Sequence, residues 1–118
     1  MQIELSNLLF HPGQVLGTPA SEALMRKHNV SHQELLQRHI SGDWGTLGDY
    51  NSTQVNKREM KLGSLETGED NKLNRIAIDS GRKERIMSAY ELGEEREVVW
   101  IITDHGHETT TFLLPSEY

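Results

Sequence analysis

The stretch that decides the fold is residues 85–118, which read RIMSAYEL-GEERE-VVWIIT-DHGHE-TTTFLLPSEY. Three segments rich in β-branched and aromatic residues are separated by two short polar connectors, 93–97 and 104–108. This pattern is typical of a three-stranded antiparallel meander, because short strands alternate with turn-forming residues. The segment 98–102 is apolar on both faces, which predicts that it belongs to the central strand.

Upstream of the meander, the sequence predicts one short strand and three helices. The run 3–10 is the predicted strand, and it ends at the turn-forming residues 11–13. Thr18 and Ser31 stand where helix N-caps are expected, because their hydroxyls can accept hydrogen bonds from helical amides. The predicted helices run from Pro19 to about His28, from Ser31 to Gly42, where the helix ends, and from Glu69 to Ser80.

These elements together predict a single α+β domain over residues 1–118. N-terminal helices are expected to pack on one face of a three- to four-stranded antiparallel sheet. A chain of 118 residues is long enough for one domain with one modest core. The polar stretch 48–68 breaks the pattern and predicts an insertion or mobile loop.

The composition narrows the function classes. The chain has no cysteine, which excludes disulfides, thiol catalysis and thiolate zinc sites. No apolar run approaches the roughly 20 residues of a membrane helix, and the start MQIELSNLLFHPG lacks the basic residues of a secretory signal. We therefore expect a soluble cytoplasmic protein. No phosphate-binding loop or dinucleotide fingerprint indicates a cofactor, and the oligomeric state is open.

Negative charge is concentrated in the C-terminal third of the chain. The net charge is −6, and residues 86–118 carry seven acidic side chains against one basic side chain. Such a domain does not favour direct nucleic-acid binding through phosphates, but it suits contact with a basic protein surface, or simple solubility. Four glutamates around the first connector are predicted to form an acidic knob that fits a basic groove: Glu91, Glu94, Glu95 and Glu97.

The second connector contains two histidines, in the order Asp104-His105-Gly106-His107-Glu108. We predict a hairpin turn in which Gly106 adopts the left-handed conformation, with His105 and His107 as candidate binding residues. A metal site needs three or four convergent ligands, and only local ones are visible. No metal site is therefore predicted.

Two more stretches hold candidate site residues. Trp44 lies in a Gly-Asp-Trp-Gly turn that is expected to direct the indole into the core, the alternative being a ring on which a ligand stacks. Arg82, Lys83 and Arg85 form the only concentrated basic spot, which we interpret as a solvated entrance to the first strand of the meander.

Several motifs in this chain occur in a familiar order: QELLQRHISGDWG at 33–45, EDNKLNRIAI at 69–78 and VVWIITDHGHETTTFLLPSEY at 98–118. They resemble a family of small plasmid-related proteins that are encoded on plasmids, integrative elements and phages. The strongest parts run from Arg38 to Gly45 and from Trp100 to Tyr118, with the motifs GDWG and VWIIT…TTxLLPxEY. The resemblance covers residues 15–47 and 69–118. It implies an origin in a mobile genetic element, but it does not supply a biochemical activity.

The chain departs from that family at two places. Residues 48–68 look like an insertion between the GDWG turn and the third helix. Where relatives tend to carry a connector of the type EADRS, this chain has the histidine connector 104–108. We therefore expect any function particular to this chain in these two segments and at the acidic knob.

An enzyme is the main alternative. Helices on an antiparallel sheet also occur in small endoribonucleases and toxins of the barnase and RelE kind, although fold does not imply function. RNA cleavage needs a base, an acid and a cation, roles that His39, His107 and Arg85 could take, with Thr109 or Thr111 on the phosphate. We interpret His39 in the first place as a buried, hydrogen-bonded histidine, and the general base is the alternative to that interpretation.

The sequence favours a binding role over catalysis. Its leading prediction is a non-enzymatic protein-binding module of a mobile element, which contacts a host protein or protein–nucleic-acid complex through its acidic surface. Inhibition of a CRISPR or restriction system is the specific form of this hypothesis. A structural accessory protein without catalytic activity is a further alternative.

Overall fold

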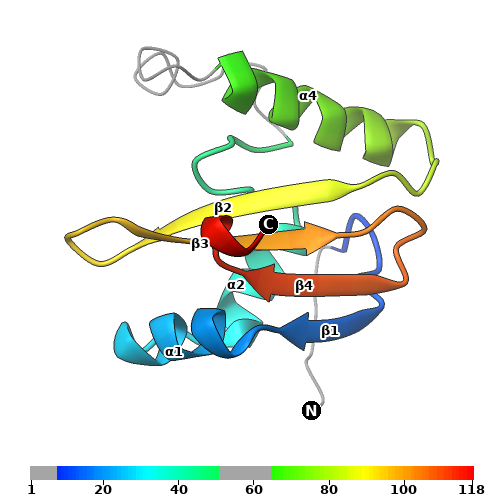
Figure 1. Ribbon diagram of the computed structural model, residues 1–118. Coiled ribbons are helices and arrows are strands. Elements are labelled where there is room, and N and C mark those ends of the chain that lie inside the picture. Colours follow the sequence, from blue (N-terminus) through cyan, green and yellow to red (C-terminus); the bar gives the residue numbers. More distant parts are fainter. Residues whose placement is uncertain (1–7, 51–64) are drawn as a thin grey trace.

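The fold is built on a four-stranded sheet with the strand order β1-β4-β3-β2, seen in a computed structural model that describes residues 8–50 and 65–118 (Figure 1). The predicted α+β class is confirmed. The elements are β1 (Gln14–Gly17), α1 (Pro19–Lys27), α2 (His32–Ile40), α4 (Leu65–Asp79), β2 (Ile86–Leu92), β3 (Glu97–Thr103), β4 (Thr109–Leu113) and the 3-10 helix η1 (Pro115–Glu117).

The predicted meander is confirmed. Strands β2, β3 and β4 pair antiparallel in sequence order, and β3 lies between the other two. Alternation places Ser88, Ile101 and Phe112 side by side on one face of the sheet, and all three are fully buried. This face holds the main core, because paired residues in neighbouring strands point the same way.

The fourth strand differs from the prediction. Residues 8–10 of the predicted strand 3–10 are not in a strand, and residues 3–7 lie outside the described residues. Instead β1 pairs parallel with β4, so that the sheet is mixed rather than wholly antiparallel. The chain reaches this place through Gly13, whose φ is +66° and where a Cβ would lie 2.3 Å from the carbonyl oxygen of Glu108. Only glycine allows so close a passage.

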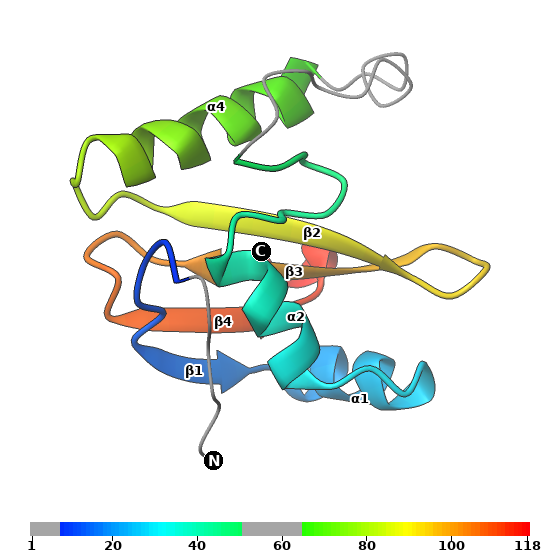
Figure 2. The same cartoon turned by 180° about the vertical axis from the view of Figure 1, so that it is seen from behind.

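The first two helices begin where the sequence predicts. The Thr18 hydroxyl accepts a hydrogen bond from the amide of Ser21 at 3.1 Å, and the Ser31 hydroxyl accepts one from the amide of Glu34 at 3.1 Å. Figure 2 shows α2 crossing one face of the sheet, whereas α4 runs beside the β2 edge. Among the described residues, no helix has both the length and the apolar character needed to cross a membrane.

Helix α4 begins earlier than predicted. Residues 65–68, which were expected to belong to the insertion 48–68, form its first turn. Residues 51–64 of that insertion lie outside the described part of the chain. The mobile loop predicted for this stretch therefore stays a prediction.

The outer edge of β2 is closed by two polar contacts. The Asn74 side chain on α4 donates to the carbonyl oxygen of Met87 at 2.7 Å and accepts from its amide at 3.0 Å. Further along, the amide of Ala89 donates to the carbonyl oxygen of Trp44 at 3.2 Å, and the amide of Thr46 donates to the carbonyl of Ala89 at 2.9 Å. An edge whose backbone groups are already bonded cannot recruit another strand.

Replacing Asn74 with alanine is expected to destabilise the protein by about 1–3 kcal/mol, because both backbone groups of the buried Met87 lose their partner. Urea unfolding at neutral pH measures the effect. The matched control is Lys72→Ala on the exposed side of the same helix, which should change stability by no more than about 0.5 kcal/mol. Equal effects of the two substitutions would contradict this account of the edge.

Candidate functional site

The connection between β2 and β3 is the most prominent projection of the described structure. Figures 1 and 2 both show this hairpin extending past the ends of β4 and β1. Its turn is tight, because Gly93 (φ 74°) and Arg96 (φ 54°) are both left-handed and the amide of Arg96 donates to the carbonyl of Gly93 at 3.2 Å. The predicted acidic knob therefore sits on a short, closed turn.

The four glutamates of the knob have different surroundings. We call Glu91, Glu94, Glu95 and Glu97 the acidic tip. Glu94 and Glu95 are exposed at the turn itself. The Glu91 carboxylate is exposed and lies 3.7 Å from the Arg96 guanidinium, measured from Oε2 to Nε. Glu97 is only partly exposed, since it takes part in a contact with α1.

The Glu97 carboxylate joins the hairpin to the C-terminal end of α1. Its Oε1 accepts from Lys27 Nζ at 2.7 Å and lies 3.1 Å from His28 Nε2. The hydrogen bond from Lys27, followed by that from His28, lowers the pKa of the Glu97 carboxyl. A Cβ at Gly93 would lie 2.4 Å from Cε1 of the His28 ring, so the turn rests directly on α1. Glu97 thus braces the tip, while the other three glutamates face outward.

The histidine connector lies against residues 81–85, which lead into β2 and which we call the basic loop because they include Arg82, Lys83 and Arg85. The amide of Gly106 donates to the carbonyl of Lys83 at 2.6 Å, and His107 Nε2 lies 2.6 Å from the carbonyl oxygen of Glu84. His105 is exposed, with Nδ1 3.7 Å from a Glu84 carboxylate oxygen. The predicted left-handed glycine is confirmed, since Gly106 has φ 94°. Two clusters that are separate in the sequence therefore form one end of the molecule.

Neither cluster has the arrangement of a metal centre. Within residues 8–50 and 65–118, no three histidine or carboxylate side chains are placed to hold a metal ion.

His39 is fully buried and hydrogen-bonded at both ring nitrogens. Nδ1 lies 2.5 Å from the hydroxyl of Ser88 on β2, and Nε2 lies 2.9 Å from the hydroxyl of Thr103 on β3. Burial, with a smaller electrostatic effect of the nearby His107 ring, lowers the pKa of His39 from 6.5 to about 3. The imidazole is therefore neutral at physiological pH.

A count of protons assigns the tautomer of His39. The Thr110 hydroxyl donates its only proton to the carbonyl oxygen of Pro12 at 2.6 Å. Thr103, which lies 2.7 Å from Thr110, must then donate to Thr110 and accept from His39 Nε2–H. Nδ1 is consequently the acceptor, and Ser88 donates to it. Both ring nitrogens of His39 are therefore occupied by hydrogen bonds inside the core, and neither is available to exchange a proton with a substrate.

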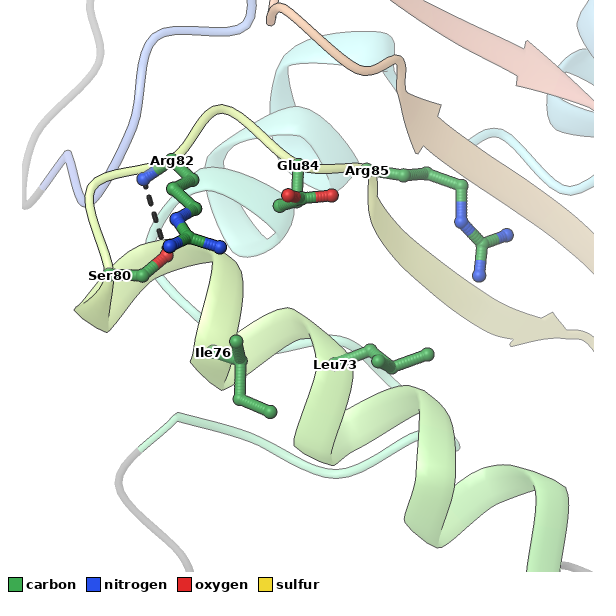
Figure 3. Close-up of a pocket in the computed structure, with 6 residues that line it drawn as sticks. All are labelled: Leu73, Ile76, Ser80, Arg82, Glu84 and Arg85. Atoms are coloured by element: carbon green, nitrogen blue, oxygen red, sulfur yellow. Dashed lines mark hydrogen bonds between the residues drawn. The ribbon is translucent and has the colours of Figure 1, made fainter.

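The residues of the ribonuclease alternative do not converge. His39 is fully buried on the Ser88 face of the sheet. Arg85 lies on the opposite side, 3.6 Å from the Met87 sulfur and 3.5 Å from an Asp70 carboxylate oxygen. Figure 3 shows the Arg85 side chain extending away from the loop that carries its neighbours Arg82 and Glu84.

His107 and Thr109 are also engaged elsewhere, and Thr111, the alternative to Thr109, pairs with Ile102 on the sheet face opposite to His39. His107 bonds the loop carbonyl at Glu84, and Thr109 donates to the Asp104 carboxylate at 2.9 Å. The arrangement offers no base, acid and cation around a common point. Trp44 is likewise fully buried, and its Nε1 donates to the carbonyl of His39 at 3.2 Å. Its ring presents no face on which a ligand could stack.

Sequence reasoning missed the residues that support the acidic tip. Lys27 and His28 were read only as the end of a helix, and nothing local connects them with Glu97, which lies 70 and 69 positions away. The available signal was weak: a helix that ends in basic residues, and a meander connector that has three glutamates with a fourth shortly before it. Opposite charge made the contact possible, but only the fold brings the two ends together.

Comparisons with known proteins return no family model, no curated protein and no solved structure that matches this chain.

The pH dependence of stability tests the state of His39. Its pKa is about 3 in the folded protein and 6.5 without the fold, so the unfolded chain binds a proton that the folded one excludes. The contribution of the neutral His39 to the free energy of unfolding is therefore fully present above pH 6.5 and is lost as the pH falls toward 3. Between these limits the wild type should lose about 1.4 kcal/mol per pH unit more than His39→Gln.

Urea unfolding of both proteins from pH 7 to pH 4 gives the two slopes, and carboxylates common to both cancel in the difference. Because His39→Gln loses stability on its own account, the slope and not the absolute stability is the readout. A second measurement, ¹⁵N NMR of the His39 ring, should show the neutral Nε2–H form throughout this range. Parallel slopes, or a ring that protonates near pH 6, would contradict the assignment.

Proposed function

We propose that this protein is a non-enzymatic binding module of a mobile genetic element, which presents its acidic tip to a basic surface of a host protein or protein–nucleic-acid complex. The specific form of the proposal is inhibition of a defence complex, of the CRISPR or the restriction kind. Such complexes bind nucleic acid through clefts lined by lysine and arginine, because phosphate neutralisation supplies much of their affinity. Carboxylates held in front of such a cleft compete with phosphates for the same cations.

One observation carries the proposal: four glutamates lie around a projecting hairpin turn. Two of them, Glu94 and Glu95, are exposed at its very end. Like charges placed close together repel one another, and this repulsion is relieved when a cationic surface approaches. A partner that brings lysine and arginine side chains therefore gains more from this turn than from scattered surface acids.

The scaffold supports the tip in a way that favours binding. The hairpin continues the seven paired positions of β2 and β3, from Ile86–Thr103 to Leu92–Glu97. Lys27 and His28 hold it from the side through Glu97. A binding segment that is already ordered loses less conformational entropy on association. Two of the four negative charges are matched by Lys27 and Arg96, which leaves Glu94 and Glu95 as the main contributors to the field.

The two alternatives have less support. The ribonuclease reading needs His39 and Arg85 around one phosphate, whereas His39 is buried on one face of the sheet and Arg85 lies on the other side. A structural accessory protein would not need an acidic tip. In that case the contacts of Glu97 with Lys27 and His28 would only stabilise the fold.

The test is protection of a phage or plasmid in cells that carry a defined CRISPR or restriction system. Cells expressing the wild-type protein should lose defence, so that plaque or transformation counts rise by a factor of ten or more, on the order expected when a tightly bound inhibitor occupies the complex. The variant Glu94→Gln with Glu95→Gln should restore defence, because it removes the two exposed charges and leaves the shape of the turn unchanged.

The matched control is Glu22→Gln with Glu34→Gln, which removes the same charge from the helical side of the molecule and should leave inhibition intact. Purified protein incubated with labelled RNA provides the enzyme arm. Inhibition that persists in the tip variant, or RNA cleavage by the wild type that His39→Ala abolishes, would overturn the proposal.

A further inference from the structure

The end of the sheet opposite the acidic tip contains a hollow of about 220 Å³. It lies where the segment before β1, the C-terminal end of α4, the basic loop and the histidine connector meet. The basic loop contributes Arg82 and Lys83, the connector contributes His107, and the N-terminal segment contributes His11. These four residues come from three separate parts of the chain and line one space.

The charge of this hollow is opposite to that of the protein. The chain carries a net charge of −6, yet none of the described residues that line the hollow is an aspartate or a glutamate. A neighbouring hollow of about 230 Å³, shown in Figure 3, differs in the charge of its lining. It also includes Arg82, but Glu84 is among its lining residues. The two spaces share Arg82, but in the second hollow Glu84 offsets part of the positive charge of Arg82 and Arg85, whereas no described lining residue offsets the cations of the first. An anion would therefore be attracted more strongly to the first.

One wall of the hollow is apolar and firmly held. Leu9 is 37% exposed there, while Phe10 is only 8% exposed and packs deeper. The Phe10 ring lies between two imidazoles, with centroids 5.2 Å from His39 and 5.4 Å from His107. Ala77 and Ile78 of α4 complete this wall. A purely inorganic anion would leave this apolar surface uncovered, so a ligand that fits carries an apolar part as well.

The basic loop is fixed in place before any ligand arrives. Its backbone is held by the bonds from Gly106 to Lys83 and from His107 to Glu84, both at 2.6 Å. The amide of Arg82 donates to the Ser80 hydroxyl at 3.2 Å, as Figure 3 shows. Because a carbonyl accepts from His107 Nε2, a ligand would meet this ring through its face or through Nδ1. An ordered loop of this kind reduces the entropy lost on binding.

We propose that this hollow binds a compact organic anion, that is, a phosphate or carboxylate group carried on a small apolar body. The anionic group would lie between Arg82 and Lys83, and the apolar body would lie against Leu9 and Phe10. The volume equals that of about seven liquid waters, which suits one charged group and one ring or short alkyl chain. The proposal is independent of the acidic tip, since β2 separates the two sites by roughly 20 Å.

The test is an NMR titration of the ¹⁵N-labelled full chain with three small probes: phenyl phosphate, phenylacetate and the neutral benzyl alcohol. At least one of the two anions should shift the amides of Gly81, Arg82, Lys83 and His107 in a saturable way. The variant Arg82→Gln with Lys83→Gln should bind it roughly tenfold more weakly or worse, because hydrogen bonds to charged groups are lost. The stronger of the two anions identifies the head group.

The matched control is Arg26→Gln with Lys72→Gln, which removes the same charge from two exposed helical positions and should leave the affinity unchanged. The ¹⁵N spectrum of each variant reports whether it is folded. The proposal is overturned if neither anion gives saturable shifts at the basic loop, if benzyl alcohol binds as tightly as the anions, or if the two double variants bind alike.

Discussion

A neutral imidazole inside the covered face of the sheet is the interaction on which the rest of the structure depends. His39 of α2 joins Ser88 of β2 to Thr103 of β3, and Thr103 passes the chain of hydrogen bonds to Thr110 of β4 and the carbonyl of Pro12. One side chain thereby fixes the helix, three strands and the segment that leads into β1. Buried hydroxyls without partners are costly, so these groups stabilise one arrangement and penalise others. The same burial that makes His39 a structural residue removes it from catalysis.

The sequence predicted those parts of the fold whose signals are local. The alternation within residues 86–113 and the caps at Thr18 and Ser31 each concern neighbours in the chain, and the meander and the helix starts followed from them. The short strand β1 could not be found in this way. Its place depends on Gly13 passing against the carbonyl of Glu108, which is a contact between distant parts of the chain. A four-residue strand has too few positions to show a period of its own.

The candidate site divides in the same manner. The glutamates of the acidic tip were identified from their crowding around one turn, and the turn does project from the sheet. The hydrogen bonds of Glu97 with Lys27 and His28 were not predictable. These partners lie at the end of α1, which only the fold brings close to Glu97. Sequence analysis also treated the basic loop and the histidine connector as two unrelated clusters. In the structure they are in contact, because the amide of Gly106 donates a hydrogen bond to the carbonyl of Lys83. The result is a sheet with an acidic surface at one end and a basic hollow at the other.

The central claim is that the acidic tip is the surface with which the protein meets its partner. A photo-reactive amino acid placed at position 94, in cells that carry a defence complex, tests it most directly. The account predicts that illumination links the chain covalently to a nucleic-acid-binding subunit of that complex, and that the same group at position 34 on α2 gives no such product. A crosslink formed from position 34 but not from position 94 would contradict it.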